Sequence, residues 1–326
     1  DMTEEIPNRS GDAFTTDDES QILNAIDKWL DKEVKDKVLA LDHADEYPIQ
    51  MVEQMKSLGL FGATISQKYG GLGMPSASYA KVVTAVSEVW MSLSGIFNSH
   101  LIMAAAVERF GTEDQKQRFL PKFATGEIRG GLALTEPSCG TDLQAIRTKA
   151  HKEGDHYLIN GSKTWISNGI EGDCVALLVK TDTEIQPRHK GMSLFLAEKG
   201  PGFSVGPKLE KLGYKGIDSA ELFFDNYVIA ADNLIGGDEG QGFHHTVGGL
   251  ELGRINVAAR GVGVANAALK AATSYAQTRE TMGKPIGQHQ AIQTKLGDMA
   301  TRCHAARLLV QDAARAYDRG ERCDME

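Results

Sequence analysis

Cysteine is scarce in this sequence, and the few residues present form no cluster. Cys139, Cys174, Cys303 and Cys323 are widely spaced, with no Cys-x-x-Cys pair and no Cys/His group. This spacing argues against a zinc site or any other metal site built on thiolates, so we expect no metal. Free thiols in a reducing compartment are expected instead. No base stands beside Cys139 in the sequence, which argues against a catalytic nucleophile.

Basic charge is also in short supply. Lys and Arg number 35 against 44 Asp and Glu, which gives a formal net charge of −9. Nucleic acid is therefore not expected as the main partner, because no basic excess is available to neutralise phosphates. No apolar run approaches the roughly 20 residues of a membrane span, so none is predicted. The acidic start, Asp1–Glu5, shows no signal-peptide core and no Arg-rich transit pattern.

The first third of the sequence carries a helical pattern. Its apolar positions recur with a period of 3.6 residues, and glycines and prolines separate the periodic stretches. Capping-box spacing occurs at Thr16 with Glu19 and at Thr112 with Gln115. We predict an all-helical domain over residues 1–128, with helices from Thr16 to about Val38, Ile49–Leu58, Ala77–Val89, Leu93–Phe110 and Glu113–Ala124.

The pattern changes at Gly130. Short β-branched and aromatic runs follow one another about every ten residues as far as Asn226, with no helix between them. This arrangement predicts an antiparallel β-sandwich or barrel over residues 129–232 and excludes a Rossmann-type dinucleotide site. Gly261-Val262-Gly263-Val264 resembles a dinucleotide motif but follows no strand. We interpret it as small residues for close helix packing.

The last part returns to helix. We predict long helices over Gly242–Gln277 and Gln290–Arg319, in a C-terminal helical domain covering residues 233–326. The fold class is therefore α+β and multidomain. Two long antiparallel helices cannot close a four-helix bundle alone. We expect this domain to be truncated, its end to be missing, or another subunit to supply the partners.

One stretch of the β region has the features of a ligand site. Leu132–Asp142 begins as an apolar strand and breaks into a polar loop at Pro137 and Gly140. Loops beyond strand ends are common ligand sites. A second strand carries Trp165 and ends at Asn168-Gly169. Any β-rich domain has such loops, so this pattern alone fits an ordinary loop without a ligand equally well.

Several motifs, taken in order, resemble the acyl-CoA dehydrogenase family of flavoenzymes. The resemblance covers the sequence from about Phe14 to Glu326. The turn Leu252-Gly253-Arg254 points to a short- or branched-chain member. The motifs are Tyr69–Gly73, Leu134–Pro137 with Gly140–Asp142, Asn160–Asn168, Lys211–Gly213, Gly240–Phe243, Leu252–Arg254 and Arg279–Gly283 with Gln290.

The resemblance implies FAD as cofactor. In the family, backbone N–H groups of the strand and loop, with the hydroxyl matched by Thr135, face the electron-accepting edge of the flavin. Such donors stabilise the negative charge of the reduced ring. Arg279 and Gln290 match positions that reach the FAD diphosphate and adenine, commonly in a neighbouring subunit. The cofactor-binding residues implied are Leu132, Leu134, Thr135, Gly140, Thr141, Trp165, Ile166, Ser167, Arg279 and Gln290.

The resemblance also implies the reaction, which is α,β-dehydrogenation of an acyl-CoA thioester to the 2-enoyl-CoA. Electrons would pass to an electron-transferring flavoprotein, and the family's usual state is a homotetramer. Its members work in the bacterial cytoplasm or the mitochondrial matrix. Arg254 could alternatively form a structural salt bridge with Glu251, one turn away. The substrate-lining residues implied are Thr141, Phe243, Leu250, Glu251 and Arg254.

The catalytic base is not found among the matched positions. Some family members carry it directly before the residue matching Arg254, where this sequence has Gly253. Others carry it in a Tyr-Glu-Gly motif, which we expect beyond Glu326, and Glu251 is the only nearby carboxylate. Three alternatives therefore stay open. They are a base-lacking relative such as an acyl-CoA desulfinase, an acyl-CoA oxidase, and a non-catalytic CoA-binding or assembly subunit.

Overall fold

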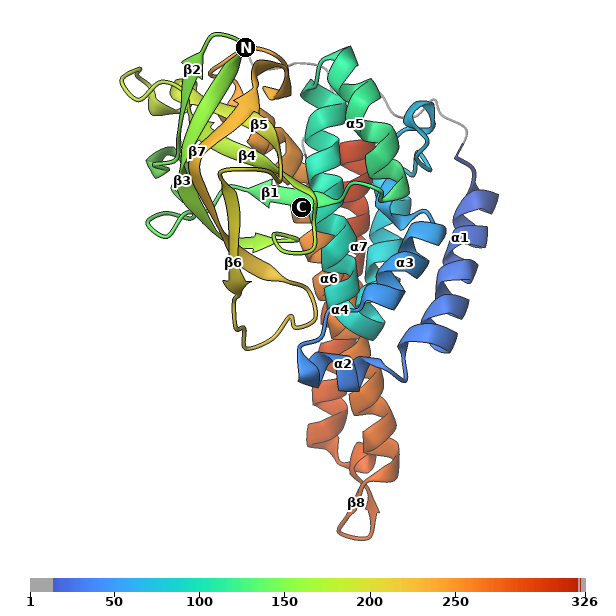
Figure 1. The fold of residues 1–326 in the computed structure, drawn as a ribbon. Coiled ribbons are helices and arrows are strands. Elements are labelled where there is room, and N and C mark those ends of the chain that lie inside the picture. The colour runs from blue at the N-terminus through green and yellow to red at the C-terminus, as the bar shows by residue number, and fades with distance from the viewer. Residues whose placement is uncertain (1–13, 322, 324–326) are drawn as a thin grey trace. The chain divides into compact units, whose positions relative to one another are not determined.

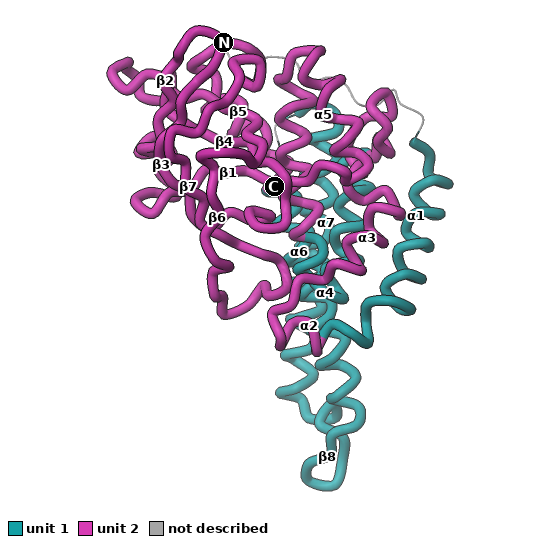
Figure 2. The backbone as a smooth tube through the Cα atoms, viewed as in Figure 1, with its two compact units in different colours: residues 1–38, 75–94, 254–326 teal, residues 39–74, 95–253 magenta. Residues whose placement is uncertain are grey.

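The computed structural model describes residues 14–321 and 323, which fall into two compact units (Figure 2). The helices α4 (Ser76–Phe110) and α6 (Gly242–Thr278) each contribute to both units. The structural elements are labelled in Figure 1. Unit 1 takes its residues from 1–38, 75–94 and 254–326, and unit 2 takes its residues from 39–74 and 95–253.

The predicted helices of the first third are confirmed, with differences at their ends. The cap of α1 is formed by Thr15 and Asp18, one residue before the predicted pair Thr16 and Glu19. The Thr112–Gln115 capping box is confirmed. The elements are α1 (Thr16–Trp29), a π-helical turn (Leu30–Val34), α2 (Val38–Ala44), α3 (Ile49–Ser57) and α5 (Glu113–Thr125).

Helix α4 joins two segments that the sequence separates. Its backbone leaves the helical region at Trp90 (φ −155°, ψ 106°), between the predicted helices Ala77–Val89 and Leu93–Phe110. By length and composition alone α4 could cross a membrane, contrary to our expectation that no stretch would qualify. Small residues such as Ala and Ser, which carry no charge, extend its apolar stretch. However, 72% of its most apolar window is buried, as in the core helix of a soluble protein.

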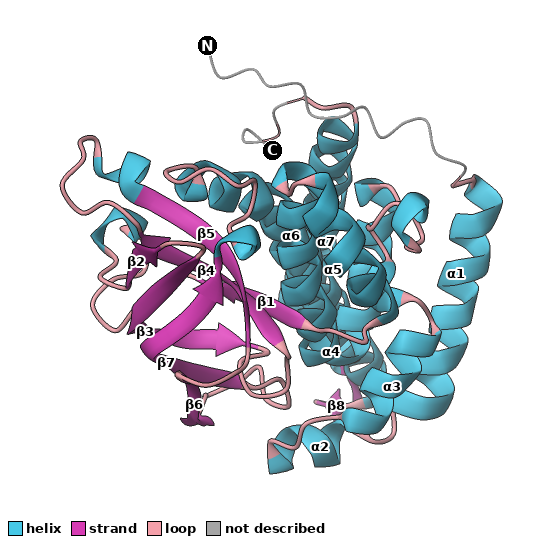
Figure 3. Cartoon of the chain, turned by 45° about the horizontal axis from the view of Figure 1, so that its top comes forward, coloured by secondary structure: helices cyan, strands magenta, loops and turns pink. Residues whose placement is uncertain are grey.

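Unit 2 contains the β-sheet (Figure 3). The path of hydrogen-bonded strands in the described residues is β1-β4-β2-β3-β7-β6, with β5 paired to β4. Most pairs are antiparallel, as predicted, but β4 runs parallel to β1 and to β2. Parallel neighbours need a crossover connection, and the β2–β3 hairpin lies between β1 and β4 in the chain. The strands are β1 (Gly130–Ala133), β2 (Lys149–Glu153), β3 (His156–Ser167), β4 (Cys174–Lys180), β5 (Met192–Glu198), β6 (Phe203–Lys208) and β7 (Ser219–Ala230).

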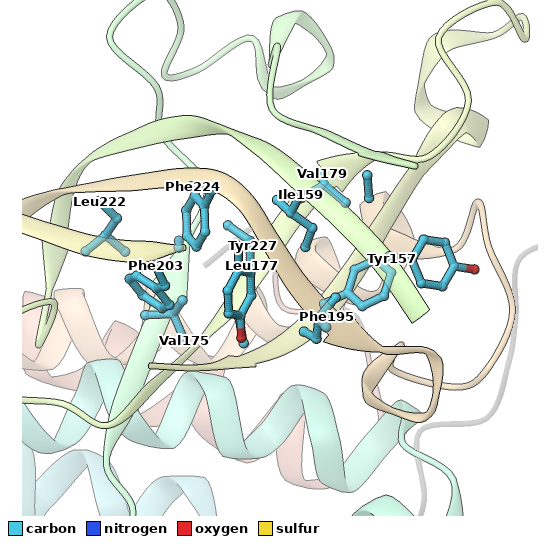
Figure 4. Close-up of a cluster of buried hydrophobic side chains, with 14 of the residues drawn as sticks. Tyr157, Ile159, Val175, Leu177, Val179, Phe195, Phe203, Leu222, Phe224 and Tyr227 are labelled. Carbon is cyan, nitrogen blue, oxygen red and sulfur yellow. The ribbon is translucent and has the colours of Figure 1, made fainter. Parts of the chain in front are cut away.

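One face of this sheet encloses an apolar core (Figure 4). Aromatic rings from several strands meet there, with the centroids of Tyr157 and Phe195 4.9 Å apart and those of Phe203 and Phe224 4.7 Å apart. Ala133 of β1 and Ile166 of β3 lie in the same core. Their neighbours in the strands therefore tend toward the opposite face, where the candidate site lies.

Unit 1 contains the larger part of α6 and the helix that follows it. Helix α6 is followed by a small hairpin of β8 (Glu280–Thr281) and β9 (Lys284–Pro285), and then by α7 (Gln290–Asp318). The Asp318 carboxylate accepts hydrogen bonds from the backbone N–H groups of Ser76 and Ala77, at 2.7 and 3.0 Å. It thereby satisfies donors at the start of α4 that have no partner within the helix.

Of the two glycines that we interpret as packing residues in α6, Gly263 serves close helix packing and Gly261 does not. A Cβ added at Gly263 would lie 2.5 Å from the Thr84 carbonyl oxygen, whereas one at Gly261 would meet nothing within 4 Å. We expect Gly261→Ala to raise the free energy of unfolding by about 0.5–1 kcal/mol, since Ala is the better helix former. Gly263→Ala should lower it by about 1–3 kcal/mol through overpacking. Urea unfolding of both variants tests this, and equal effects would contradict it.

Candidate functional site

The candidate site in unit 2 begins where β1 ends. Ala133 is buried in the core, while Leu132 and Leu134 on either side of it are only half-buried. Thr135 follows half-buried, and the chain then turns back between Glu136 and Cys139, whose backbone groups form two reciprocal hydrogen bonds of 2.9 and 3.1 Å. Gly140 and Thr141 beyond the turn are exposed. Half-buried apolar side chains are thus followed, at the strand end, by hydroxyl side chains that are half-buried or exposed.

Strand β3 lies beside this segment. The backbone N–H of Thr164 donates to the carbonyl oxygen of Thr135 at 2.9 Å. At the other end, a Cβ added to Gly131 would lie 2.8 Å from the Ser167 carbonyl oxygen. The structure therefore brings the two predicted stretches together, with Trp165 and Ser167 next to Leu132–Thr135.

Trp165 departs from regular strand geometry. Its φ is +60°, and the register between β3 and β7 shifts between Lys163 and Ile166. Its side chain is 56% exposed, while Thr164 and Ile166 are buried. A large flat ring in solvent, next to hydroxyl groups, suits contact with a planar ligand. The side chain of Ile166 lies in the β core, so the cofactor contact that we predict for this residue would be made by its backbone.

A buried ion pair lies under this surface. The Lys163 ammonium is 2.9 Å from Glu136 Oε1, and the two side chains are 0% and 3% exposed. Burial alone would raise the pKa of the Glu136 carboxyl, but the nearby Lys163 brings it below the ordinary value. Burial also lowers the pKa of Lys163, which Glu136 opposes. Each charge therefore stabilises the other.

A second group of predicted residues lies in the part of α6 that belongs to unit 2. Phe243 is half-buried against His189, with ring centroids 5.7 Å apart, and Leu250 is half-buried as well. Glu251 does not form the alternative salt bridge with Arg254. Its Oε2 lies 3.6 Å from Nη1 of Arg109 at the end of α4.

The remaining predicted residues lie in unit 1. Arg254, Arg279 and Gln290 are all exposed. Arg279 stands directly before the β8–β9 hairpin, and its carbonyl oxygen accepts from Ile286 N–H at 2.8 Å. Gln290 is the first residue of α7.

Sequence reasoning missed Lys163 and Glu136 as site residues, and it missed Arg109. A lysine inside a strand that carries an apolar stretch is a usable signal, because a buried ammonium requires a partner. Its partner lies 27 residues away, across two strands, and no local pattern indicates it. Within residues 14–321 and 323, no group of three or more His, Cys, Asp or Glu side chains could hold a metal ion.

Comparison with known proteins identifies the family. The acyl-CoA dehydrogenase N-terminal, middle and C-terminal domains match residues 16–127, 131–227 and 240–326, in that order. The chain belongs to the acyl-CoA dehydrogenase family. Enzymes of this family are FAD-dependent oxidoreductases, and the helical–β–helical order that we predicted is that of the family. The boundaries predicted from the sequence, 1–128, 129–232 and 233–326, stay predictions.

Individual relatives agree with this. An acyl-CoA dehydrogenase of Bacillus subtilis is 38% identical over 95% of this chain and 82% of its own length. The mitochondrial isovaleryl-CoA dehydrogenase of Pongo abelii is 34% identical over 94% of this chain and 73% of its own. A chain in a structure of the electron transferring flavoprotein of Acidaminococcus fermentans has 36% identity and a TM-score of 0.90, covering 95% of this chain and 82% of that one.

Proposed function

We propose that this enzyme uses FAD to oxidise a short- or branched-chain acyl-CoA to the 2-enoyl-CoA and passes the electrons to an electron-transferring flavoprotein. The juxtaposition of Leu132–Thr135 with the exposed Trp165 carries the proposal. An apolar surface with an exposed ring and hydroxyls at its edge suits a tricyclic ring with one polar side. The similarity to an isovaleryl-CoA dehydrogenase and to a chain solved with an electron transferring flavoprotein supports the substrate class and the acceptor.

The residues present suit FAD. Leu132, Leu134 and Trp165 would cover the apolar part of the ring, and the hydroxyls of Thr135, Thr141 and Ser167 can donate hydrogen bonds to its polar edge. Gly140 would let the backbone approach. Bound FAD supplies the acceptor for the hydride that leaves the β-carbon of the substrate. We assign Arg279 and Gln290 to the diphosphate and adenine, in a neighbouring subunit of a homotetramer, since the guanidinium fork binds phosphate oxygens bidentately.

For the acyl-CoA, we propose a channel lined by Thr141, Phe243, Leu250 and Glu251 of unit 2, and from its motif we assign Arg254 to the same substrate. Gly253 has no acid group, and a Cβ there would already lie 3.0 Å from Ile102 Cδ1. A carboxylate side chain would therefore require Ile102 to move. The Glu251 carboxylate is already held in an ion pair, 3.6 Å from the Arg109 guanidinium. We therefore assign Glu251 to lining the channel and not to proton removal.

Anaerobic titration of the FAD-loaded protein with a panel of straight and branched acyl-CoA thioesters tests the proposal. We expect the visible flavin absorption to bleach with one short or branched substrate, and reoxidation to be fast with an electron-transferring flavoprotein and slow with O₂. Rapid reaction of the reduced protein with O₂ would instead favour an oxidase. Protein that stays colourless after incubation with FAD would refute the proposal and favour a non-catalytic subunit.

The role of Glu251 has its own test. A general base contributes roughly 10²–10⁴-fold to a rate. If Glu251 only lines the channel, Glu251→Gln should change kcat by less than about threefold and act mainly on KM. Arg109→Gln removes the same ion pair from the other side and should have a similar effect. A fall in kcat of about a hundredfold or more in Glu251→Gln alone would make Glu251 the base.

A further inference from the structure

The segment that follows β1 leaves the sheet before it reaches the candidate site. The ladder between β1 and β4 ends with Ala133 opposite Leu177. Leu134 and Thr135, which we assign to the flavin, lie beyond this ladder. Something other than the β1–β4 pairing must therefore fix their position.

Lys163 of β3 and two backbone N–H groups of the loop before β2 donate hydrogen bonds to this segment. Lys163 Nζ donates to the carbonyl oxygen of Leu134 at 3.0 Å and to Glu136 Oε1 at 2.9 Å. The backbone N–H groups of Arg147 and Thr148 donate to the two oxygens of the same carboxylate, at 2.5 and 3.0 Å. One buried carboxylate thus accepts from three donors, and one buried ammonium binds both Glu136 in the turn and the carbonyl of Leu134, two residues earlier.

The bulge in β3 places the side chains of Lys163 and Trp165 on different faces of the strand. Residues two apart in a regular strand share a face. Lys163 and Trp165 do not, because Lys163 is fully buried while Trp165, with φ +60°, is 56% exposed. The strand therefore binds the turn from beneath through Lys163 and presents Trp165 to solvent two residues later. Movement of Lys163 would be transmitted directly to Trp165.

We propose that Glu136 and Lys163 are positioning residues that hold Leu134, Thr135 and Trp165 in the geometry that binds the flavin. The ion pair touches no ligand itself. It acts through the Leu134 carbonyl, the Glu136–Cys139 turn and the Thr164–Thr135 hydrogen bond. The part of this inference that concerns the flavin rests on the function proposed above, while the part that concerns the backbone does not.

The first test needs no cofactor. The double variant Glu136→Gln/Lys163→Gln keeps an acceptor and a donor at the two positions but removes both charges. Its matched control is Asp45→Asn/Lys208→Gln, which neutralises a half-buried ion pair of 2.8 Å elsewhere in unit 2. Hydrogen exchange of the ligand-free proteins, followed by mass spectrometry of peptides, reports the backbone directly.

We expect exchange at least tenfold faster than wild type in peptides covering 132–142 and 160–168 of the Glu136/Lys163 variant, with 192–198 of β5 unchanged. The control variant should leave all three peptides unchanged. Unchanged exchange in the first two peptides would overturn the proposal. Equal acceleration of all three would also overturn it, because that result means general loosening of unit 2.

The second test measures the reduction potential of bound FAD against a reference dye under anaerobic conditions. The Glu136/Lys163 variant should change the ratio of affinities for reduced and oxidised flavin at least tenfold, which is about 30 mV for a two-electron couple. The Asp45/Lys208 variant should match wild type. An unshifted potential in a variant that binds FAD would overturn the role toward the flavin. Wild-type protein that binds no FAD would refute the proposed function, and the exchange result would still decide the backbone role.

Discussion

Lys163→Met is expected to lower the free energy of unfolding by about 3–5 kcal/mol, the usual cost of leaving one buried charge without its partner. Glu136 is 3% exposed, so water cannot replace the lost ammonium. The Leu134 carbonyl loses a donor as well. Urea unfolding at pH 7, followed by circular dichroism, measures the change, and the midpoint should fall without a large change in slope.

The matched double variant separates charge from packing. In Glu136→Gln/Lys163→Met no charge is buried, and the amide oxygen replaces one of the two carboxylate oxygens that accept from Arg147 and Thr148. The other backbone N–H loses its acceptor. We expect this double variant to lose less stability than Lys163→Met alone, because the pair is coupled. If the losses from Glu136→Gln and Lys163→Met simply add in the double variant, the two charges do not stabilise each other.

The parts of the fold that depend on local patterns could be predicted from the sequence. Helix α3 ends at Ser57 and is followed by Gly59 with φ +75°, as the glycine signal indicates. The interpretation of Gly263 as a packing residue also needed only its helical context. Periodicity and caps act over a few residues, so the local sequence indicates them. Its resolution is about one residue: Thr15 with Asp18 and Thr16 with Glu19 have the same spacing, and the first pair forms the capping box of α1.

The parts that depend on distant residues could not be predicted in this way. Glu251 and Arg254 have ideal helical spacing, yet Glu251 pairs with Arg109, 142 positions earlier in the chain. Pairing across such a distance depends on which helices pack together, and spacing along one helix carries no information about it.

The site shows the same division. Leu132–Thr135 and Trp165–Ser167 could be selected by motif, and their proximity follows from the Thr164–Thr135 hydrogen bond. The positive φ of Trp165 could not be predicted, since that conformation is uncommon for a bulky residue. The bulge also explains why Ile166, chosen together with its neighbours, belongs to the core. Tertiary contacts decide the face on which each side chain lies.

Acid should destabilise unit 2 through His100. This side chain is fully buried between Phe61 and Phe123, and burial, with Arg129 nearby, lowers its pKa to about 4. Nδ1 lies 3.3 Å from the N–H of Gly130 and accepts its hydrogen bond, so the ring proton is on Nε2, which donates to the Phe123 carbonyl at 2.9 Å. Protonation at Nδ1 would put a second N–H against Gly130, the first residue of β1.

The sign follows from the two pKa values. His100 in the unfolded chain takes up a proton below about pH 6.5, whereas in the folded protein it resists protonation down to about pH 4. The stability tied to this residue is therefore complete above pH 6.5 and falls as the pH drops toward 4, by about 3 kcal/mol in total at 1.36 kcal/mol per unit. Urea midpoints measured between pH 7.5 and 4 give the curve.

His100→Gln is the matched control, because a glutamine can accept from Gly130 and donate to Phe123 without titrating. The wild-type curve should fall more steeply than that of His100→Gln between pH 6.5 and 4, and the difference isolates His100. Subtraction is necessary because burial also lowers the pKa of His245 to about 4, with His244 adding to the effect, and that contribution is present in both proteins. Parallel curves would mean that His100 titrates alike in the folded and unfolded states, contrary to its burial. A steeper fall of wild-type stability confined to this window would mean that protonation of His100 destabilises the folded protein. His100 binds Gly130, so the start of β1, the strand that carries Leu132, would then be sensitive to acid.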